Sequence, residues 1–230
     1  MNNQIGMRIM IEFIAENEEI ELKSYDPGTT LKELSDALEA FRLTCSFKTI
    51  DCKGCGECCS DNIPVLGLDL QVLQERLGIS FEEASQSIIA LPEKPDINAR
   101  RKAIKEMSKS ASISEIEAAI LYEYNNAEPI ILAKQEKGEC CFLKNKLCSK
   151  YTIRPYSCGL YLCNMGEKLS YIEEMIIRQG TWHAYYKLGW IGMEEIAHNP
   201  FFKADSYDKL LLSDFDFNLE NSLEQLFFYF

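Results

Sequence analysis

The segment Cys52-Lys-Gly-Cys55-Gly-Glu-Cys58-Cys59 holds four of the ten cysteines in this 230-residue chain. Its C-x2-C-x2-C spacing lets short turns direct several thiolates to one centre, and its two glycines permit tight or left-handed backbone. Cys58 and Cys59 are adjacent, so in extended or irregular backbone their side chains diverge and one of the two is expected to serve another purpose. The spacing favours a metal site that is completed by cysteines from elsewhere in the chain.

A second group of cysteines lies between residues 138 and 163. It comprises Gly138-Glu-Cys140-Cys141-Phe-Leu143, then Cys148-Ser-Lys-Tyr151, then Arg154-Pro-Tyr-Ser-Cys158, and finally Cys163. Together the two groups resemble the YkgJ-type family, the CxxCxxCC zinc- or iron-chelating domain. Its pattern runs C-x2-C-x2-C-C, Gly-x-Cys-x-Phe-Leu, Cys-x2-Tyr and Arg-Pro-x2-Cys. The resemblance covers roughly residues 52 to 163.

The resemblance implies a set of metal-ligating cysteines, with Cys45, Cys141 and Cys163 outside the pattern and Gly159 where family members often carry an arginine. The matching set is Cys52, Cys55, Cys58, Cys59, Cys140, Cys148 and Cys158. A [4Fe–4S] cluster needs four thiolates. Two tetrahedral zinc ions need eight ligand positions, which seven thiolates supply if one sulfur bridges.

The spacing of the first group is closer to a cluster loop than to the paired C-x2-C knuckles of zinc sites. We therefore expect a [4Fe–4S] cluster held by Cys52, Cys55 and Cys58, with zinc as the alternative cofactor. The fourth ligand is expected from the second group, and the candidates are Cys148, Cys158 and Cys163.

Three functions fit this constellation. The first is an iron–sulfur protein with a redox or cluster-based catalytic role. The second is S-adenosylmethionine-dependent methyl transfer, because flagellin lysine N-methylases resemble this family in their cysteine region. The third is a structural zinc module that presents an interaction surface. The sequence carries no G-x-G-x-x-G, P-loop, H-E-x-x-H or G-x-S-x-G motif, so whether the chain is an enzyme stays open, and so do any catalytic residues and the protein or small-molecule partner.

The remaining composition is that of an ordinary globular protein, with 47% hydrophobic and 26% charged residues. The 24 Lys and Arg against 36 Asp and Glu give a net charge of −12, which argues against a nucleic-acid partner. The sequence shows no secretory signal and no long apolar run, so we expect a cytoplasmic protein without membrane association. In that reducing compartment clustered cysteines are more often metal ligands than disulfides. The basic stretch 99–109 is expected to be a solvated helix face.

Hydrophobic periodicity predicts an α+β fold. Residues 7–14 and 19–25 alternate as a β-hairpin, and Thr30 with Glu33 forms a capping box for the following helix. This hairpin and helix resemble the opening half of β-grasp domains. The expected organisation is an N-terminal element over 1–45, a cysteine-cluster metal-binding domain over 46–165 and a helical C-terminal extension over 166–230.

The middle of the chain, residues 68–126, is helical in pattern. Gly78 should end one helix, and the pairs Ser80 with Glu83 and Ser112 with Glu115 should begin two others. A strand is expected over 129–133, followed by two cysteine-bearing loops joined around the metal, and a long helix over 170–188. The apolar residues 226–230 should pack in the core, with a homodimer contact as the alternative.

Several side chains near the cysteines are candidates for supporting roles. His183 and His198 are expected to be packing residues rather than ligands. Arg154 would either donate N–H groups to a thiolate or pair with an acidic residue, and Tyr151 should pack against the site. The aromatic residues Trp182, Tyr185, Tyr186 and Trp190 are expected in the core rather than around a pocket.

Overall fold

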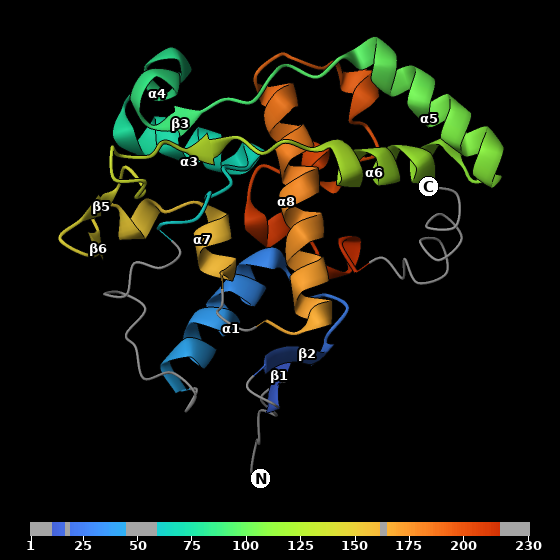
Figure 1. The fold of residues 1–230 in the computed structure, drawn as a ribbon. Coiled ribbons are helices and arrows are strands. Elements are labelled where there is room, and N and C mark those ends of the chain that lie inside the picture. Colours follow the sequence, from blue (N-terminus) through green and yellow to red (C-terminus); the bar gives the residue numbers. More distant parts are fainter. Residues whose placement is uncertain (1–10, 17–18, 45–58, 162–164, 217–230) are drawn as a thin grey trace, which may run out of the picture.

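The computed structural model describes residues 11–16, 19–44, 59–161 and 165–216. A long helix, α8 (Glu167–Lys187), forms the axis of this part of the chain (Figure 1). The helices α3, α6 and α7 and strand β2 all pack against it. Its buried residues cover more than one face, as expected of a helix enclosed by neighbours. The helix predicted over 170–188 is thus confirmed.

The N-terminal hairpin and helix are confirmed within the described residues. Strands β1 (Ile11–Glu16) and β2 (Glu19–Tyr25) pair antiparallel. Helix α1 (Leu31–Thr44) begins at the predicted capping box, in which the Thr30 N–H donates to Glu33 Oε2 over 2.8 Å and the Glu33 N–H donates to Thr30 Oγ1 over 3.2 Å. Residues 7–10 lie outside the described residues, and the finer likeness to a β-grasp domain stays a prediction.

The middle of the chain is helical, as predicted. Its helices are α3 (Gly67–Leu77), α4 (Phe81–Ser87), α5 (Ile97–Ala111) and α6 (Glu115–Asn126). Helix α3 ends at Gly78 with a φ of 66°, and α4 begins at the Ser80 capping box. The capping box predicted at Ser112 is wrong. Ser112 has a φ of 55° and ends α5, whereas the extended Ser114 caps α6 by accepting the Glu117 N–H over 3.1 Å.

Short antiparallel pairs complete the α+β fold. Strand β3 (Ile89–Ala90) pairs with β4 (Ile131–Leu132), which confirms two residues of the strand predicted over 129–133, and β5 (Leu143–Lys144) pairs with β6 (Leu147–Cys148). Between β5 and β6, Asn145 and Lys146 have positive φ values of 52° and 65°, the backbone of a type I′ hairpin turn. Helix α7 (Tyr156–Leu160) follows.

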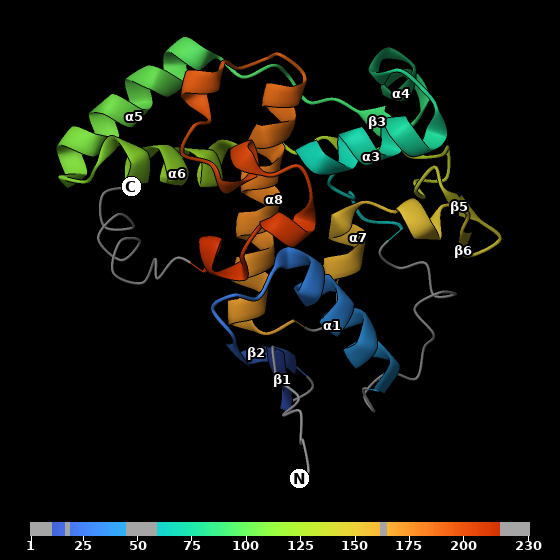
Figure 2. The ribbon, with the colours of Figure 1, turned by 180° about the vertical axis from the view of Figure 1, so that it is seen from behind.

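The C-terminal part of the described chain wraps α1 and α8 with short 3₁₀ segments (Figure 2). These are η2 (Met193–Glu195), η3 (Pro200–Lys203), η4 (Tyr207–Lys209) and η5 (Leu212–Asp214), preceded by η1 (Tyr151–Ile153) near the cysteines. The Leu31 N–H donates to the Leu210 carbonyl over 2.9 Å, and the Leu212 N–H donates to the Thr29 carbonyl over 2.8 Å. This backbone pairing fixes the C-terminal wrap to the start of α1.

The largest hydrophobic cluster draws residues from all three predicted segments, among them Leu34, Leu66, Tyr156, Ile176 and Phe215. The boundaries near residues 45 and 165 stay a prediction. A second cluster lies under α3 and α4 and includes Leu73, Ile130 and Phe142. Packed in or against it are Cys59, Cys140, Cys141, Cys148 and Cys158. The cysteines that the structure describes therefore share one apolar surrounding.

Several further expectations meet the structure here. Trp182 and Tyr185 are buried in a third cluster with Tyr186 and Trp190 against it, which confirms core packing. The prediction of a solvated face over 99–109 is wrong for Arg100, which is only 3% exposed because two buried carboxylates pair with it. Among the helices that the structure describes, none is long and apolar enough to cross a membrane. The apolar segment 226–230 lies outside the described residues.

His183 is a packing residue, as expected, and its contacts make it sensitive to pH. It is 1% exposed and stacks on Phe201, with ring centroids 5.8 Å apart. Its Nδ1 has no hydrogen-bond partner among the residues described. A Cβ at Gly67 would lie 2.3 Å from this nitrogen, so glycine is needed for the approach of α3 to α8. Burial, with a smaller contribution from Lys187, lowers the pKa of His183 to about 4.

This lowered pKa predicts a loss of stability on acidification. Between the ordinary His pKa of 6.5 and about pH 4 the unfolded chain holds a proton on this residue and the folded chain does not, so stability falls as the pH falls. Between pH 7 and pH 5 the free energy of unfolding should fall by about 2 kcal/mol more in the wild type than in His183→Gln. Urea titrations of both proteins at both pH values measure this difference, because pH effects common to the two cancel. An equal fall in both would contradict it.

Candidate metal centre

Backbone pairing brings the end of the first cysteine group to the start of the second. Residues 63–65 run beside 130–132, with the Val65 N–H donating to the Ile130 carbonyl over 2.7 Å and the Leu132 N–H donating to the Ile63 carbonyl over 2.9 Å. At the end of this pairing the Cys140 N–H donates to the Cys59 carbonyl over 2.7 Å. Cys59 and Cys140 are 81 positions apart in the sequence and adjacent in the fold.

The loop that carries Cys140 is held by Gln135 and by a glycine turn. Gly138 has a φ of 80°, and its N–H donates to the Gln135 carbonyl over 2.8 Å. The Gln135 Nε2 group donates to the carbonyls of Cys140 and Leu143 over 2.7 and 2.8 Å. Leu143 lies opposite Cys148 in the β5–β6 pair. The hairpin thus returns Cys148 to the loop that holds Cys140.

Cys140 and Cys141 differ in their readiness to act as thiolates. A hydrogen bond from the Cys141 thiol is the largest influence that holds the pKa of Cys140 below its usual range, and the Phe142 N–H and the Lys134 charge act in the same direction against the effect of burial. The Phe142 N–H lies 3.4 Å from Cys140 Sγ. The same thiol–thiolate contact, together with burial, raises the pKa of Cys141. The contact between the two sulfurs therefore favours the thiolate at Cys140 and the thiol at Cys141.

Cys158 lies on α7, whose first residue is anchored by a buried carboxylate. Asp69, 4% exposed, accepts the N–H groups of Leu66 and Tyr156, each over 3.0 Å, and the Tyr207 hydroxyl over 2.8 Å. Burial raises the pKa of Asp69 to about 6, although these three donors act in the opposite direction. The carboxylate therefore fixes α7, and with it Cys158, to the start of α3. A helix N-terminus without a Ser, Thr, Asp or Asn cap, followed by Asp at its third position, is the signal for this role.

The predicted ligand set stays a prediction. Cys52, Cys55 and Cys58 lie outside the described residues, as do Cys45 and Cys163. Within the described part of the chain, no three His, Cys, Asp or Glu side chains are grouped so that they could hold a metal ion. Cys59, Cys140, Cys148 and Cys158 are thus gathered around one apolar cluster without forming a complete metal site by themselves.

The side chains that were candidates for supporting roles contact carboxylates and so stabilise the fold. Arg154 pairs with Glu39 over 3.2 Å, as the acid-pairing alternative predicts, and its guanidinium lies 4.2 Å from the Tyr151 ring centroid. The Tyr151 hydroxyl is 3.2 Å from the same carboxylate. These contacts tie the segment between Cys148 and Cys158 to α1. His198 Nε2 lies 3.2 Å from the buried Glu123, so it belongs to an ion-pair network away from the cysteines.

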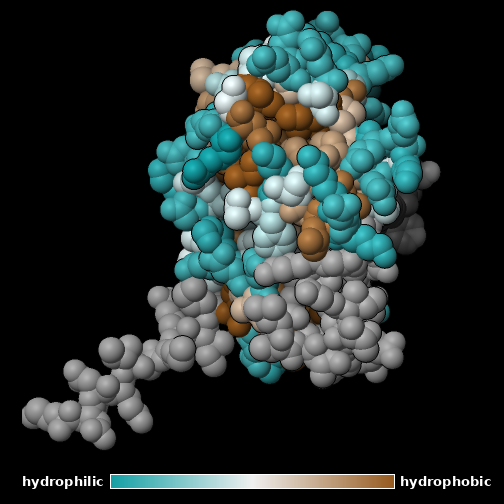
Figure 3. All heavy atoms as spheres, turned by 90° about the vertical axis from the view of Figure 1, so that its left-hand side faces the viewer, coloured by the Kyte–Doolittle hydropathy of each residue, from teal (hydrophilic) through white to brown (hydrophobic). Residues whose placement is uncertain are grey.

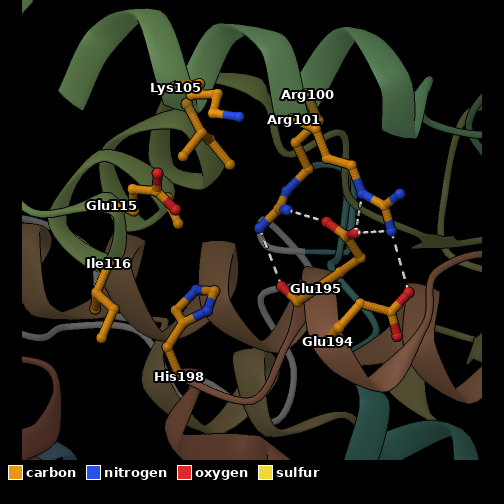
Figure 4. Close-up of a pocket in the computed structure, with 10 residues that line it drawn as sticks. Arg100, Arg101, Lys105, Glu115, Ile116, Glu194, Glu195 and His198 are labelled. Atoms are coloured by element: carbon orange, nitrogen blue, oxygen red, sulfur yellow. Dashed lines mark hydrogen bonds and ion pairs between the residues drawn. The ribbon is translucent and has the colours of Figure 1, made fainter. Parts of the chain in front are cut away.

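That network borders a cavity of about 400 Å³ between α5, α6 and the segment 194–198 (Figure 4). Arg100 and Arg101 both pair with Glu195, and Arg100 also lies 2.5 Å from Glu123. Helices α5 and α6, which line the cavity, lie on the opposite side of the molecule from β5 and β6 (Figure 1). Because Arg100 and the half-exposed Arg101 together balance the charges of the buried Glu123 and Glu195, we attribute the network to fixing η2 on α5, and the cysteine region remains the candidate site.

Comparison with known proteins bears directly on the cysteine region. A family named CxxCxxCC and described as a zinc- or iron-chelating domain matches residues 51–175, more than half of the chain. The chain belongs to the CxxCxxCC family. The match ends later than the sequence pattern predicts and includes the first part of α8. Leu169, Ile172 and Met175 from that part pack in the cluster that contains Tyr156 and Leu160, so the family region is one packed unit with its last helix. No curated protein and no solved structure matches the chain.

The role assigned to Asp69 in this CxxCxxCC protein predicts a large loss of stability on its removal. Asp69→Ala leaves two buried N–H groups and a buried tyrosine hydroxyl without their acceptor. The free energy of unfolding should therefore fall by about 3 kcal/mol. Asp96→Ala is the matched control, because Asp96 caps α5 at an exposed position and its loss should cost about 1 kcal/mol. Denaturant unfolding at pH 7 measures both, and equal losses in the two variants would contradict the assignment.

Proposed function

We propose that this CxxCxxCC protein binds a [4Fe–4S] cluster between its two cysteine groups and uses it in electron transfer or cluster-based catalysis. The observation that carries the proposal is the 2.7 Å hydrogen bond from the Cys140 N–H to the Cys59 carbonyl. It places the end of the first group directly beside the start of the second, which supports ligation of one centre from both groups.

The donor groups around Cys140 suit a thiolate-ligated metal. The Phe142 N–H donates to Cys140 Sγ, which is the kind of contact that offsets charge on a thiolate ligand, and the pKa of Cys140 is lowered below its usual range, chiefly by the Cys141 thiol. The surrounding apolar cluster buries Cys140 and partly covers the other described cysteines. Cys52, Cys55 and Cys58 of the family pattern would supply three ligands, and Cys148, Cys158 or the additional Cys163 would supply the fourth. When bound, such a cluster supplies one-electron chemistry.

The cysteine region also lies where a partner can reach it. β5 and β6 form one end of the described molecule (Figure 1), and apolar side chains reach the surface on that side (Figure 3). The second hydrophobic cluster lies beneath this face, and the partly buried residues packed against it include Ile79, Phe81, Ile88, Cys141 and Cys148. A redox centre close to such a surface suits electron exchange with a protein partner.

Zinc is the alternative that the family description keeps open. Two zinc ions with one bridging sulfur would employ all seven family cysteines and would contribute directly to folding stability. The two readings separate in one measurement, because a dithionite-reduced iron–sulfur protein gives an electron paramagnetic resonance signal and a zinc protein gives none.

Metal analysis of anaerobically purified protein tests the proposal. We expect about four iron and four acid-labile sulfide per chain, and a brown colour that bleaches with dithionite. Cys55→Ser should lose most of the bound iron because it removes a loop thiolate. Cys45→Ser is the control, since Cys45 precedes the family match, and it should keep a full cluster. A colourless wild-type protein with stoichiometric zinc after reconstitution would overturn the iron–sulfur assignment.

A further inference from the structure

The Lys134 side chain lies against the last residue of the first cysteine group and the two residues that follow it. Its Nζ group donates to the carbonyl oxygens of three successive residues, at 3.5 Å for Cys59, at 2.9 Å for Ser60 and at short range for Asp61. An ammonium group carries three N–H donors around a compact charge, so it can donate to three converging carbonyl oxygens at once. The side chain is only partly exposed. The contact thus fixes a charge as well as a loop.

Satisfying these carbonyls does not require a lysine. Ser60 and Asp61 are exposed, so water would hydrate their carbonyl oxygens if Lys134 were absent. Ordering a lysine side chain also costs rotamer entropy. The contact therefore gives residues 59–61 a defined position and holds a positive charge at a fixed place beside them.

The same residue holds the second cysteine group through its main chain. Lys134 forms an antiparallel bridge with Cys140, and the neighbouring Ala133 carbonyl accepts the Cys141 N–H over 2.9 Å. One side chain and its own backbone thus connect both cysteine groups.

We infer that Lys134 is a positioning residue of the metal centre, which holds residues 59–61, at the end of the first cysteine group, against the second group and offsets part of the negative charge that converging thiolates bring. The inference rests on the proposed function only in requiring a thiolate-bound metal, whether iron or zinc. A centre with four thiolates carries a net negative charge in an already acidic protein, so a fixed cation beside it favours metal loading.

The test is cobalt(II) binding by the full chain, because cobalt reports thiolate ligation through its charge-transfer absorption and competes with a chelator for affinity measurement. Lys134→Met, which removes charge and hydrogen bonds, should weaken the affinity 10- to 100-fold and lower the charge-transfer intensity per cobalt. Lys137→Met is the matched control, because Lys137 is exposed on the turn of the same loop, and its affinity should stay within twofold of the wild type.

Two intermediate variants separate charge from hydrogen bonding and cover the case in which Lys134→Met does not fold. Lys134→Arg keeps the charge, Lys134→Gln keeps two N–H donors, and both should bind cobalt less tightly than the wild type and more tightly than Lys134→Met. Far-UV circular dichroism of the metal-free proteins checks that each variant retains its helices. Affinities equal to the wild type in all three folded variants would overturn the inference alone. A wild type that binds neither cobalt, zinc nor iron would overturn the proposed function and the inference together.

Discussion

The structure around the cysteines depends on one backbone contact, the hydrogen bond from the Cys140 N–H to the Cys59 carbonyl. The pairing of residues 63–65 with 130–132 leads into it, and the Gln135 turn and the β5–β6 hairpin lead away from it. Two helical hairpins, α3–α4 and α5–α6, separate these segments in the sequence. The long connection is tolerable because helices form locally and the entropy of closing a loop grows only slowly with its length.

Helix α8 and the Asp69 carboxylate hold α3 and α7 in place next to this pairing. Helix α3 approaches α8 closely because Gly67 and Gly180 have no Cβ. A Cβ at Gly67 would lie less than 3.0 Å from His183, and a Cβ at Gly180 would lie 3.0 Å from Leu66. Asp69 then joins α3 to α7 by accepting N–H groups from both. The position of the helix that carries Cys158 is therefore set in part by a buried carboxylate that is distant in the sequence. The family match continues into α8 as far as residue 175, and Leu169, Ile172 and Met175 from that part pack in one cluster with Tyr156 and Leu160 of α7.

The elements that local patterns specify were predictable from the sequence. Helix α8, the capping boxes at Thr30 and Ser80 and the stop at Gly78 each depend on residues within one or two turns. Ser112 shows the limit of that approach, because two serines with suitably spaced glutamates compete there and the left-handed end of α5 decides between them.

Features that depend on distant partners were not predictable in this way. Arg100 is buried because Glu123 and Glu195 meet it from elsewhere in the chain, and Lys134 is held by carbonyls of residues 59–61. The cysteine pattern gave the family and the candidate ligands, and the order in which their loops meet required the three-dimensional structure.

The surplus of cysteines over the four that a cluster needs follows from the geometry of adjacent residues. Each group contains a Cys-Cys pair, and neighbouring side chains cannot easily reach one small centre together. At Cys140 and Cys141 the two sulfurs differ, because the contact between them lowers the pKa of Cys140 and raises that of Cys141. A thiol donor beside a thiolate lowers the charge on the ligand sulfur without adding a ligand, as backbone N–H groups do. Cys141 lies outside the seven family cysteines, so among those seven only Cys58 and Cys59 are adjacent, and one of these two is expected to serve a purpose other than ligation of a shared four-thiolate centre.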